Sequence, residues 1–163
     1  LKTAILAATF GKATDSTDAL TFSVTPSPPF MIAKVFGQNM ILSPNGRFPV
    51  KDDSVPFMVI GLSASEDLSI SDKKAFSERR VTKIAKIKNI AVAQSAPIKI
   101  GNLSGYVTTA KGVGESTAPP LTIYQVILFD RSGYYVFQGI TPSSEKNTYI
   151  PAFEMTAKSF KIK

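Results

Sequence analysis

The stretch IYQVILFDRSGYYVFQGI, from Ile123 to Ile140, decides how the rest of this sequence is interpreted. Two apolar and aromatic runs flank a short polar segment, Asp130 to Gly133, and this arrangement is typical of a β-hairpin. Alternate residues of a strand face opposite sides of its sheet, and here both sets are largely apolar: Ile123, Gln125, Ile127 and Phe129 on one side, Tyr124, Val126, Leu128 and Asp130 on the other. A strand of this kind is covered on both faces. We therefore predict the central hairpin of a sheet that lies between helices.

Further antiparallel strands are predicted before this hairpin. Apolar and polar residues alternate in ALTFSVTP, which starts at Ala19 and ends at a proline. FMIAKVFG, NMILSPNG and VPFMVIGLSAS predict a meander whose last strand covers residues 57–64, and Asn45-Gly46 predicts a tight turn. IAVAQSAPIKIG and LSGYVTTAKG predict two more strands joined at Gly101-Asn102. The polar segment from Lys111 to Pro120 predicts an exposed loop.

Two segments carry a helical period. After Ser71, steps of three and four residues connect Phe76, Arg80, Ile84 and Ile87, and basic residues fill most positions between them. Ser71 or Asp72 is the expected N-cap of this basic helix. The second helix is expected to have Pro151 in its first turn, and its apolar face holds Phe153, Ala157 and Phe160.

Helices around a mostly antiparallel sheet define the α+β class. The chain has 163 residues, a length that suits one compact domain. We therefore predict a single α+β domain over residues 1–163, with an irregular N-terminal extension over roughly residues 1–18.

The composition limits the chemistry of this chain. Histidine and cysteine are both absent, which excludes a serine–histidine–acid triad, a thiolate nucleophile, disulfides and metal sites built from these ligands. We interpret Asp15 with Asp18, and Asp52 with Asp53, as turn and cap residues, and so predict no metal site and no cofactor. No apolar run reaches the roughly 18 residues of a membrane-spanning helix.

The formal net charge is +7, which is compatible with an anionic partner. Much of the excess lies between Ser71 and Ile90, where seven basic residues face two acids: Lys73, Lys74, Arg79, Arg80, Lys83, Lys86 and Lys88 against Asp72 and Glu78. A solvated outer face is the simpler interpretation, and contact with an acidic protein is the functional one. Because no aromatic ladder or glycine-rich motif accompanies the charges, we expect no specific nucleic-acid binding.

Three passages resemble the PsbP-like superfamily: IGNLSGYVTTA, YQVILFDRSGYYVFQGITP and YIPAFEMTAKSF. In that superfamily a glycine-containing strand precedes a long aromatic hairpin and a terminal helix with a phenylalanine near a serine, here Ser159-Phe160. LTFSVTP takes the place of its first strand. The superfamily includes extrinsic proteins of the oxygen-evolving complex, a Ran-binding nuclear import factor and bacterial DcrB-like proteins. The resemblance implies a three-layer α/β/α sandwich and generally a non-catalytic role.

Three hypotheses for function follow. We expect a non-catalytic accessory protein, exported to the periplasm of a bacterium, which contacts another protein and is not an enzyme. The first alternative is a cytoplasmic DcrB-like chaperone of secretion effectors, which would dimerise and offer an apolar groove. The second is a hydrolase acting through carboxylates or lysine, which requires two acids, or an acid and a lysine, to converge in a pocket. The sequence leaves the oligomeric state open between monomer and dimer.

The candidate partner-binding residues lie at two places, and no catalytic residue is predicted. At the tip of the hairpin, Tyr134 and Tyr135 are expected to present their hydroxyls outward beside Asp130 and Arg131. The other aromatic residues of the hairpin are expected to fill the core. On the basic helix the candidates are Lys73, Arg79, Arg80 and Lys83.

Overall fold

The computed structural model describes residues 16–50, 55–63, 70–115, 119–131 and 133–163. Its main sheet has seven strands: β2 (Met31–Phe36), β3 (Asn39–Ser43), β4 (Phe57–Ser63), β5 (Ile87–Ile100), β6 (Leu103–Gly114), β7 (Pro120–Asp130) and β8 (Gly133–Pro142). The helices are α2 (Lys73–Val81), the short 3-10 helix η1 (Ser143–Glu145) and α3 (Lys146–Lys158). Two short strands, β1 (Phe22–Ser23) and β9 (Lys161–Ile162), pair with each other.

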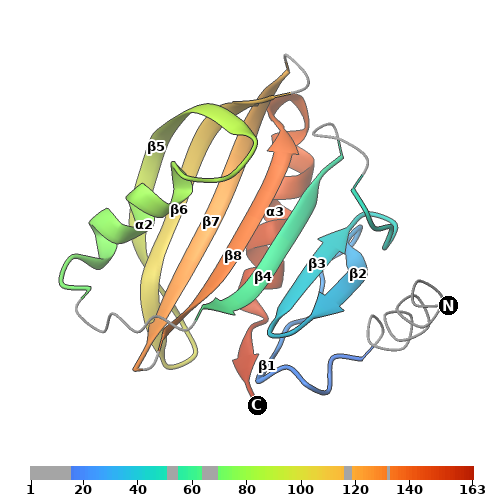
Figure 1. Ribbon diagram of the computed structural model, residues 1–163, viewed down its shortest axis with the longest axis vertical. Helices are drawn as coiled ribbons and strands as arrows, with labels where there is room; N and C mark the ends of the chain where they lie inside the picture. The colour runs from blue at the N-terminus through green and yellow to red at the C-terminus, as the bar shows by residue number, and fades with distance from the viewer. Residues whose placement is uncertain (1–15, 51–54, 64–69, 116–118, 132) are drawn as a thin grey trace, which may run out of the picture.

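The main sheet lies between α2, on one face, and α3, on the other (Figure 1). Its strand order is β2-β3-β4-β8-β7-β6-β5, and every neighbouring pair is antiparallel. The predicted α+β class with a mostly antiparallel sheet is therefore confirmed. No helix in the described ranges is long and apolar enough to span a membrane.

The strand order determines where α2 lies. β4 pairs with β8, whereas β5 forms the far edge of the sheet beyond β7 and β6. The chain between β4 and β5 must therefore cross one face of the sheet, and α2 makes this crossing over β6, β5 and β7. Ser77 and Val81 are the buried residues of α2. Asp72 caps its start, since the carboxylate accepts a hydrogen bond of 2.9 Å from the amide of Ala75.

The β7–β8 hairpin is the centre of the fold, as predicted. Residues 121–128 of β7 are buried without interruption, because α2 and its flanking segments cover one face and α3 covers the other. Gly139 of β8 allows α3 to approach closely, since a Cβ at this position would lie 2.5 Å from the ring of Phe153. The Gly101-Asn102 turn between β5 and β6 is also confirmed, and Gly101 has φ of +58°.

The C-terminal residues bind the start of the chain to the core. The Ser159 hydroxyl accepts a hydrogen bond of 2.8 Å from the Thr25 amide, and the Thr156 hydroxyl accepts one of 2.9 Å from the Ser27 amide. Phe160 is buried against Phe22, Tyr135 and Phe137. The Ser159-Phe160 pair therefore attaches the β1 segment to the sheet.

Two predicted boundaries near the N-terminal half are wrong. The first strand is confined to Phe22–Ser23, and it pairs with β9 rather than joining the main sheet. The basic helix ends at Val81, so Ile84 and Ile87 do not continue its period. Lys86 has a left-handed φ of 65°, which stops any helix before β5 begins.

Two predicted boundaries in the C-terminal half are also wrong. Within the expected loop from Lys111 to Pro120, residues 111–114 belong to β6 and Pro120 begins β7, while residues 116–118 lie outside the described ranges. The last helix begins at Lys146 rather than near Pro151, which therefore lies inside α3. Pro151 removes one helical hydrogen bond, and the residue whose carbonyl loses that partner, Asn147, is exposed to water.

Several sequence predictions fall outside the described residues. These are most of the N-terminal extension, the residues Asp15, Asp52 and Asp53, and Ser132 of the hairpin turn.

Removal of the Phe160 ring should strongly destabilise the protein. Phe160 is 5% exposed and contacts three aromatic rings, so Phe160→Ala is expected to lower the free energy of unfolding by about 3–5 kcal/mol. Urea denaturation measures the change. Ile162→Ala is the control, because Ile162 is 51% exposed, and a loss of similar size there would contradict the packing argument.

The buried Tyr124 hydroxyl should make stability sensitive to alkaline pH. It has no hydrogen-bond partner among the residues that the structure describes, and burial, with a smaller effect of Glu154, raises the pKa of Tyr124 above its usual value. The folded state therefore favours the neutral phenol, and stability is lost as pH rises above the unfolded pKa of about 10. Tyr124→Phe is expected to be at least as stable as the wild type at neutral pH. Above about pH 10 it should be more stable than the wild type by a margin that grows with pH. Thermal unfolding across this range tests it, and a constant margin would refute the coupling.

Candidate functional site

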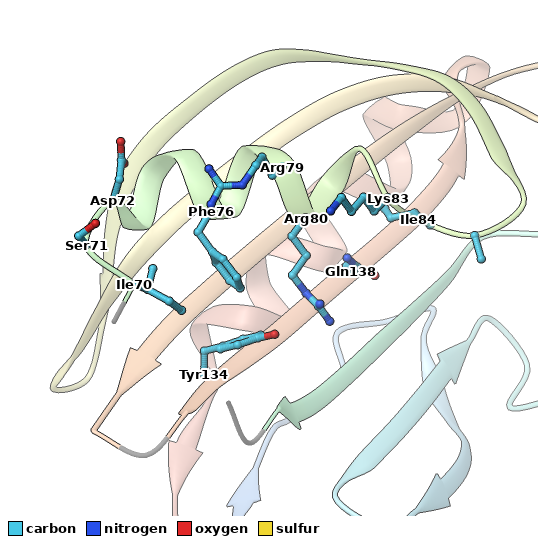
Figure 2. Close-up of a pocket in the computed structure, with 11 residues that line it drawn as sticks. Ile70, Ser71, Asp72, Phe76, Arg79, Arg80, Lys83, Ile84, Tyr134 and Gln138 are labelled. Atoms are coloured by element: carbon cyan, nitrogen blue, oxygen red, sulfur yellow. The ribbon is translucent and has the colours of Figure 1, made fainter. Parts of the chain in front are cut away.

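A cleft of about 710 Å³ opens between α2 and β8, and we call it the α2–β8 cleft. Its lining comes from the segment before α2, from α2 and the residues after it, and from β8 (Figure 2). The residues that matter most are Asp72, Phe76, Arg79, Arg80, Lys83, Tyr134 and Gln138.

Aromatic rings form one wall of the cleft. The Phe76 ring lies edge-on to Tyr134, with 5.1 Å between ring centres, and to Phe129 at 5.9 Å. The Lys73 ammonium lies 5.3 Å from the centre of the Phe129 ring. These contacts fix the first turns of α2 on the hairpin and leave little freedom to Phe76 and Tyr134.

Arg80 extends from α2 toward β8, between Tyr134 and Gln138 (Figure 2). Its guanidinium carbon lies 5.3 Å from the centre of the Tyr134 ring, which is a cation–π contact. The Nε atom is buried, and no group of the described residues accepts a hydrogen bond from it. Within the described chain the two side-chain ion pairs are Lys74–Glu78 and Lys158–Glu154, so no carboxylate there neutralises Arg80.

Two glutamines place α2 over the sheet. Gln125 of β7 is fully buried, and its side-chain amide donates a hydrogen bond of 2.9 Å to the carbonyl of Ser77. The Gln138 amide donates a bond of 2.9 Å to the side-chain oxygen of Gln125. This chain of bonds links β8, β7 and α2. Because Arg80 is three residues after Ser77, on the neighbouring turn, the same bonds hold its backbone above β8.

The charge around the cleft is positive. Arg79 and Lys83 are exposed side chains that flank Arg80. Asp72 is the single acid among the lining residues, and its carboxylate caps the start of α2. The geometry is therefore suited to an anionic group that enters beside Tyr134.

A second, smaller hollow of about 160 Å³ adjoins the cleft. It is bounded by β3, β4 and β8, and Val59, Leu62 and Val136 contribute apolar side chains. Arg80 and Gln138 line both cavities. The two spaces therefore meet at Arg80, and together they cross from α2 to β4.

The structure brings together four of the predicted partner-binding residues: Arg79, Arg80, Lys83 and Tyr134 all line the cleft. Lys73 lies beside them on Phe129. Asp130 and Arg131 are exposed at the end of the hairpin and are not lining residues, and the Arg131 amide donates to the Asp130 carboxylate at 2.7 Å.

The predicted pair of outward-facing tyrosines at the hairpin tip is wrong. Tyr134 and Tyr135 are 7% and 4% exposed. Because β8 begins at Gly133, these consecutive residues face opposite sides of the sheet. Tyr134 lies under α2, whereas Tyr135 packs against Phe22 and Phe160 on the other face.

The sequence interpretation missed Gln138 and Phe76 as site residues. The sequence pattern predicts for Phe76 only a position on the apolar side of the basic helix. Gln138 shares the α2-facing side of β8 with Tyr134 and Val136 at period two, so a polar residue in this otherwise apolar set was the available signal.

Comparison with known proteins identifies the fold. No family model and no curated protein matches this sequence. Among solved structures, LpqN of Mycobacterium tuberculosis, described as involved in cell envelope biogenesis, is 11% identical with a TM-score of 0.60, over 91% of this chain and 86% of that one. Cyanobacterial PsbP (CyanoP) of Synechocystis is 11% identical with a TM-score of 0.53, over 91% of this chain and 96% of that one.

A third solved structure has a similar fold. PA94 of Pseudomonas aeruginosa, a protein of unknown function, is 12% identical with a TM-score of 0.54, over 80% of this chain and 94% of that one. Identities this low establish the architecture alone. The protein has the PsbP-like fold that the sequence resemblance predicted.

The glutamine chain should be essential for the position of α2. Gln125→Leu would leave the Ser77 carbonyl and the Gln138 amide without their partner, at a cost of about 1–3 kcal/mol. Relative to the wild type, we expect the variant to show faster amide hydrogen exchange in α2 and little change in α3, measured by mass spectrometry. Gln94→Leu on β5 is the matched control, because Gln94 is exposed. Unchanged exchange in α2 would show that the apolar contacts of Phe76 and Val81 suffice.

Proposed function

We propose that this protein is a non-catalytic accessory protein that binds an acidic region of another protein through α2 and the α2–β8 cleft. The observation that carries this proposal is the concentration of Arg79, Arg80 and Lys83 around one cleft, where the single lining acid is engaged as a helix cap. Complementary charge speeds association and selects partners. The net charge of +7 favours the same class of partner.

We further propose that the protein acts outside the cytoplasm of a bacterium. This part of the proposal is supported by the fold shared with LpqN, which is described as involved in cell envelope biogenesis. It is tested by fractionation of the source bacterium with an antibody against the chain. Recovery in the cytoplasmic fraction alone would contradict it.

A hydrolase receives no support from the described residues that line the cleft. That function requires two acids, or an acid and a lysine, to converge. Asp72 is the one acid present, and Figure 2 shows it at the opposite end of α2 from Lys83.

The DcrB-like chaperone remains the second candidate because of a specific surface at the edge of the sheet. Four large apolar side chains on and near the edge strand β2 are 37–58% exposed: Met31, Ile32, Phe36 and Phe48. A chaperone that dimerises would cover such residues. Light scattering at increasing protein concentration tests it, since a dimer that dissociates when Met31 and Phe36 are replaced by serine would favour this candidate.

The accessory role is tested by affinity capture from the source bacterium at about 0.15 M salt, where long-range charge effects are screened beyond about 8 Å. We expect the wild type to retain one partner in stoichiometric amount, and the triple variant Lys73→Glu, Arg79→Glu, Lys83→Glu to lose it. These three side chains are exposed, so the fold should tolerate the changes.

The matched control reverses the charge on the other face of the molecule. Lys146→Glu with Lys158→Glu and Lys161→Glu changes three exposed residues in α3 and β9, and this variant of equal net charge should leave capture intact. Equal loss in both variants would show that binding follows net charge and not the face that bears α2.

A further inference from the structure

We propose that Arg80 is a carboxylate-binding residue: the α2–β8 cleft receives an acidic side chain of the partner, and the two Nη atoms of Arg80 bind its carboxylate end-on. This inference rests on the proposed accessory function. It adds the chemistry of the ligand and the residue that recognises it.

Arg80 has unused hydrogen-bonding capacity. A guanidinium carries five N–H donors in a planar fork that matches a carboxylate. In the described part of the chain the Arg80 guanidinium has a cation–π contact with Tyr134 and no side-chain ion pair. Its Nε is buried without an acceptor. The guanidinium end points away from α2 into the cleft (Figure 2), so an anion there meets the Nη atoms.

The guanidinium is also held in place before any ligand binds. The Tyr134 ring beneath it is itself packed on Phe76, and the backbone of α2 is tied to β7 through Gln125. Ligand binding therefore causes little further loss of conformational entropy in this side chain. Because one edge of the guanidinium is already withdrawn from water, its interaction with an anion is less weakened by solvent than that of Arg79.

The shape and lining of the site favour a peptide segment. The cleft and the adjoining hollow meet at Arg80 and run from α2 to β4, which suits an extended chain with an acidic residue at its centre. Phe76, Ile84 and Val136 provide apolar surface on either side of Arg80. The large apolar side chains that are exposed in the described ranges all lie outside α2, so this helix lacks the apolar face of one that inserts into a membrane.

The test separates the fork of Arg80 from its charge. The probe is a short fluorescein-labelled peptide of alternating glutamate and valine, and the reference peptide has glutamine in place of glutamate. Fluorescence anisotropy measures the affinity. Arg80→Lys keeps the charge but loses the planar fork, and we expect it to weaken binding by about tenfold or more.

Arg79→Lys is the matched control, because Arg79 is the exposed arginine next to Arg80 on the same helix. We expect it to change the affinity by less than about twofold, as for a solvated ion pair. A second readout is the Nε–Hε signal of each arginine in nitrogen–proton NMR spectra of the wild type. The Arg80 signal should shift on addition of the glutamate peptide, and the Arg79 signal should not.

Three outcomes overturn the inference. If Arg80→Lys binds like the wild type, the site senses charge alone. If wild-type protein prefers the glutamate peptide no more than the glutamine peptide, no carboxylate is recognised. If phosphatidylglycerol vesicles bind the wild type and Arg80→Lys equally while the peptide does not bind, the site serves a membrane surface.

The accessory function can survive these failures. Capture of one partner that is lost in the triple variant but kept in Arg80→Lys would uphold the proposed function and reject Arg80 as its recognition residue. Thermal unfolding of each variant controls for stability. Since Arg80 lacks an ion-pair partner in the described chain, Arg80→Lys is expected to melt within a few degrees of the wild type, and a binding loss at unchanged stability supports the inference.

Discussion

The antiparallel pairing of β4 with β8 is the constraint on which the rest of the structure depends. It joins two meanders, β2-β3-β4 and β5-β6-β7-β8, so that consecutive strands β4 and β5 are separated by three others. The connecting segment must cross one face of the sheet, and α2 is the part of it that packs there. The opposite face is free for α3, which follows β8 after the short helix η1. Both layers of the sandwich are consequences of this one pairing.

The same crossing creates the cleft. α2 packs mainly on β5, β6 and β7, and its Phe76 and Arg80 side chains reach Tyr134 of β8. A helix seated over the middle of the sheet would have buried Tyr134 and Gln138 completely. Instead the space beside β8 stays open, and the basic residues of α2 stand at its rim.

Burial of the Arg80 Nε lowers the stability of the folded state. A buried N–H without an acceptor costs about 1–3 kcal/mol, and no carboxylate in the described chain offsets it. Stacking on Tyr134 returns part of that cost. Buried polar groups without a partner are uncommon in protein interiors and call for a reason other than stability. At Arg80 we take that reason to be the Nη end of the guanidinium, which points into the cleft.

The sequence by itself determined the central hairpin, the two helices, the α+β class and the basic character of α2. Each of these is local: two-sided apolar alternation in residues 123–140 requires cover on both faces, and the step of Phe153, Ala157 and Phe160 gives one buried stripe. Predicted boundaries failed where a distant partner overrode local preference, as at residues 111–113, which pair with residues 120–122 of β7 where the sequence predicts the start of a loop.

Only the tertiary structure decided which candidates form a site. Lys73, Arg79 and Arg80 share α2, and Lys83 follows its end, but the sequence does not show that these residues lie beside β8, because strand order depends on pairings between distant residues. Nor does it show that Tyr134 and Tyr135, adjacent in the chain, belong to opposite layers. The register of β8 sends Tyr134 to the cleft with Arg80 and Tyr135 to the core with Phe160. The net charge follows from the composition alone, whereas Arg80, Tyr134 and Gln138 come together only when the sheet forms.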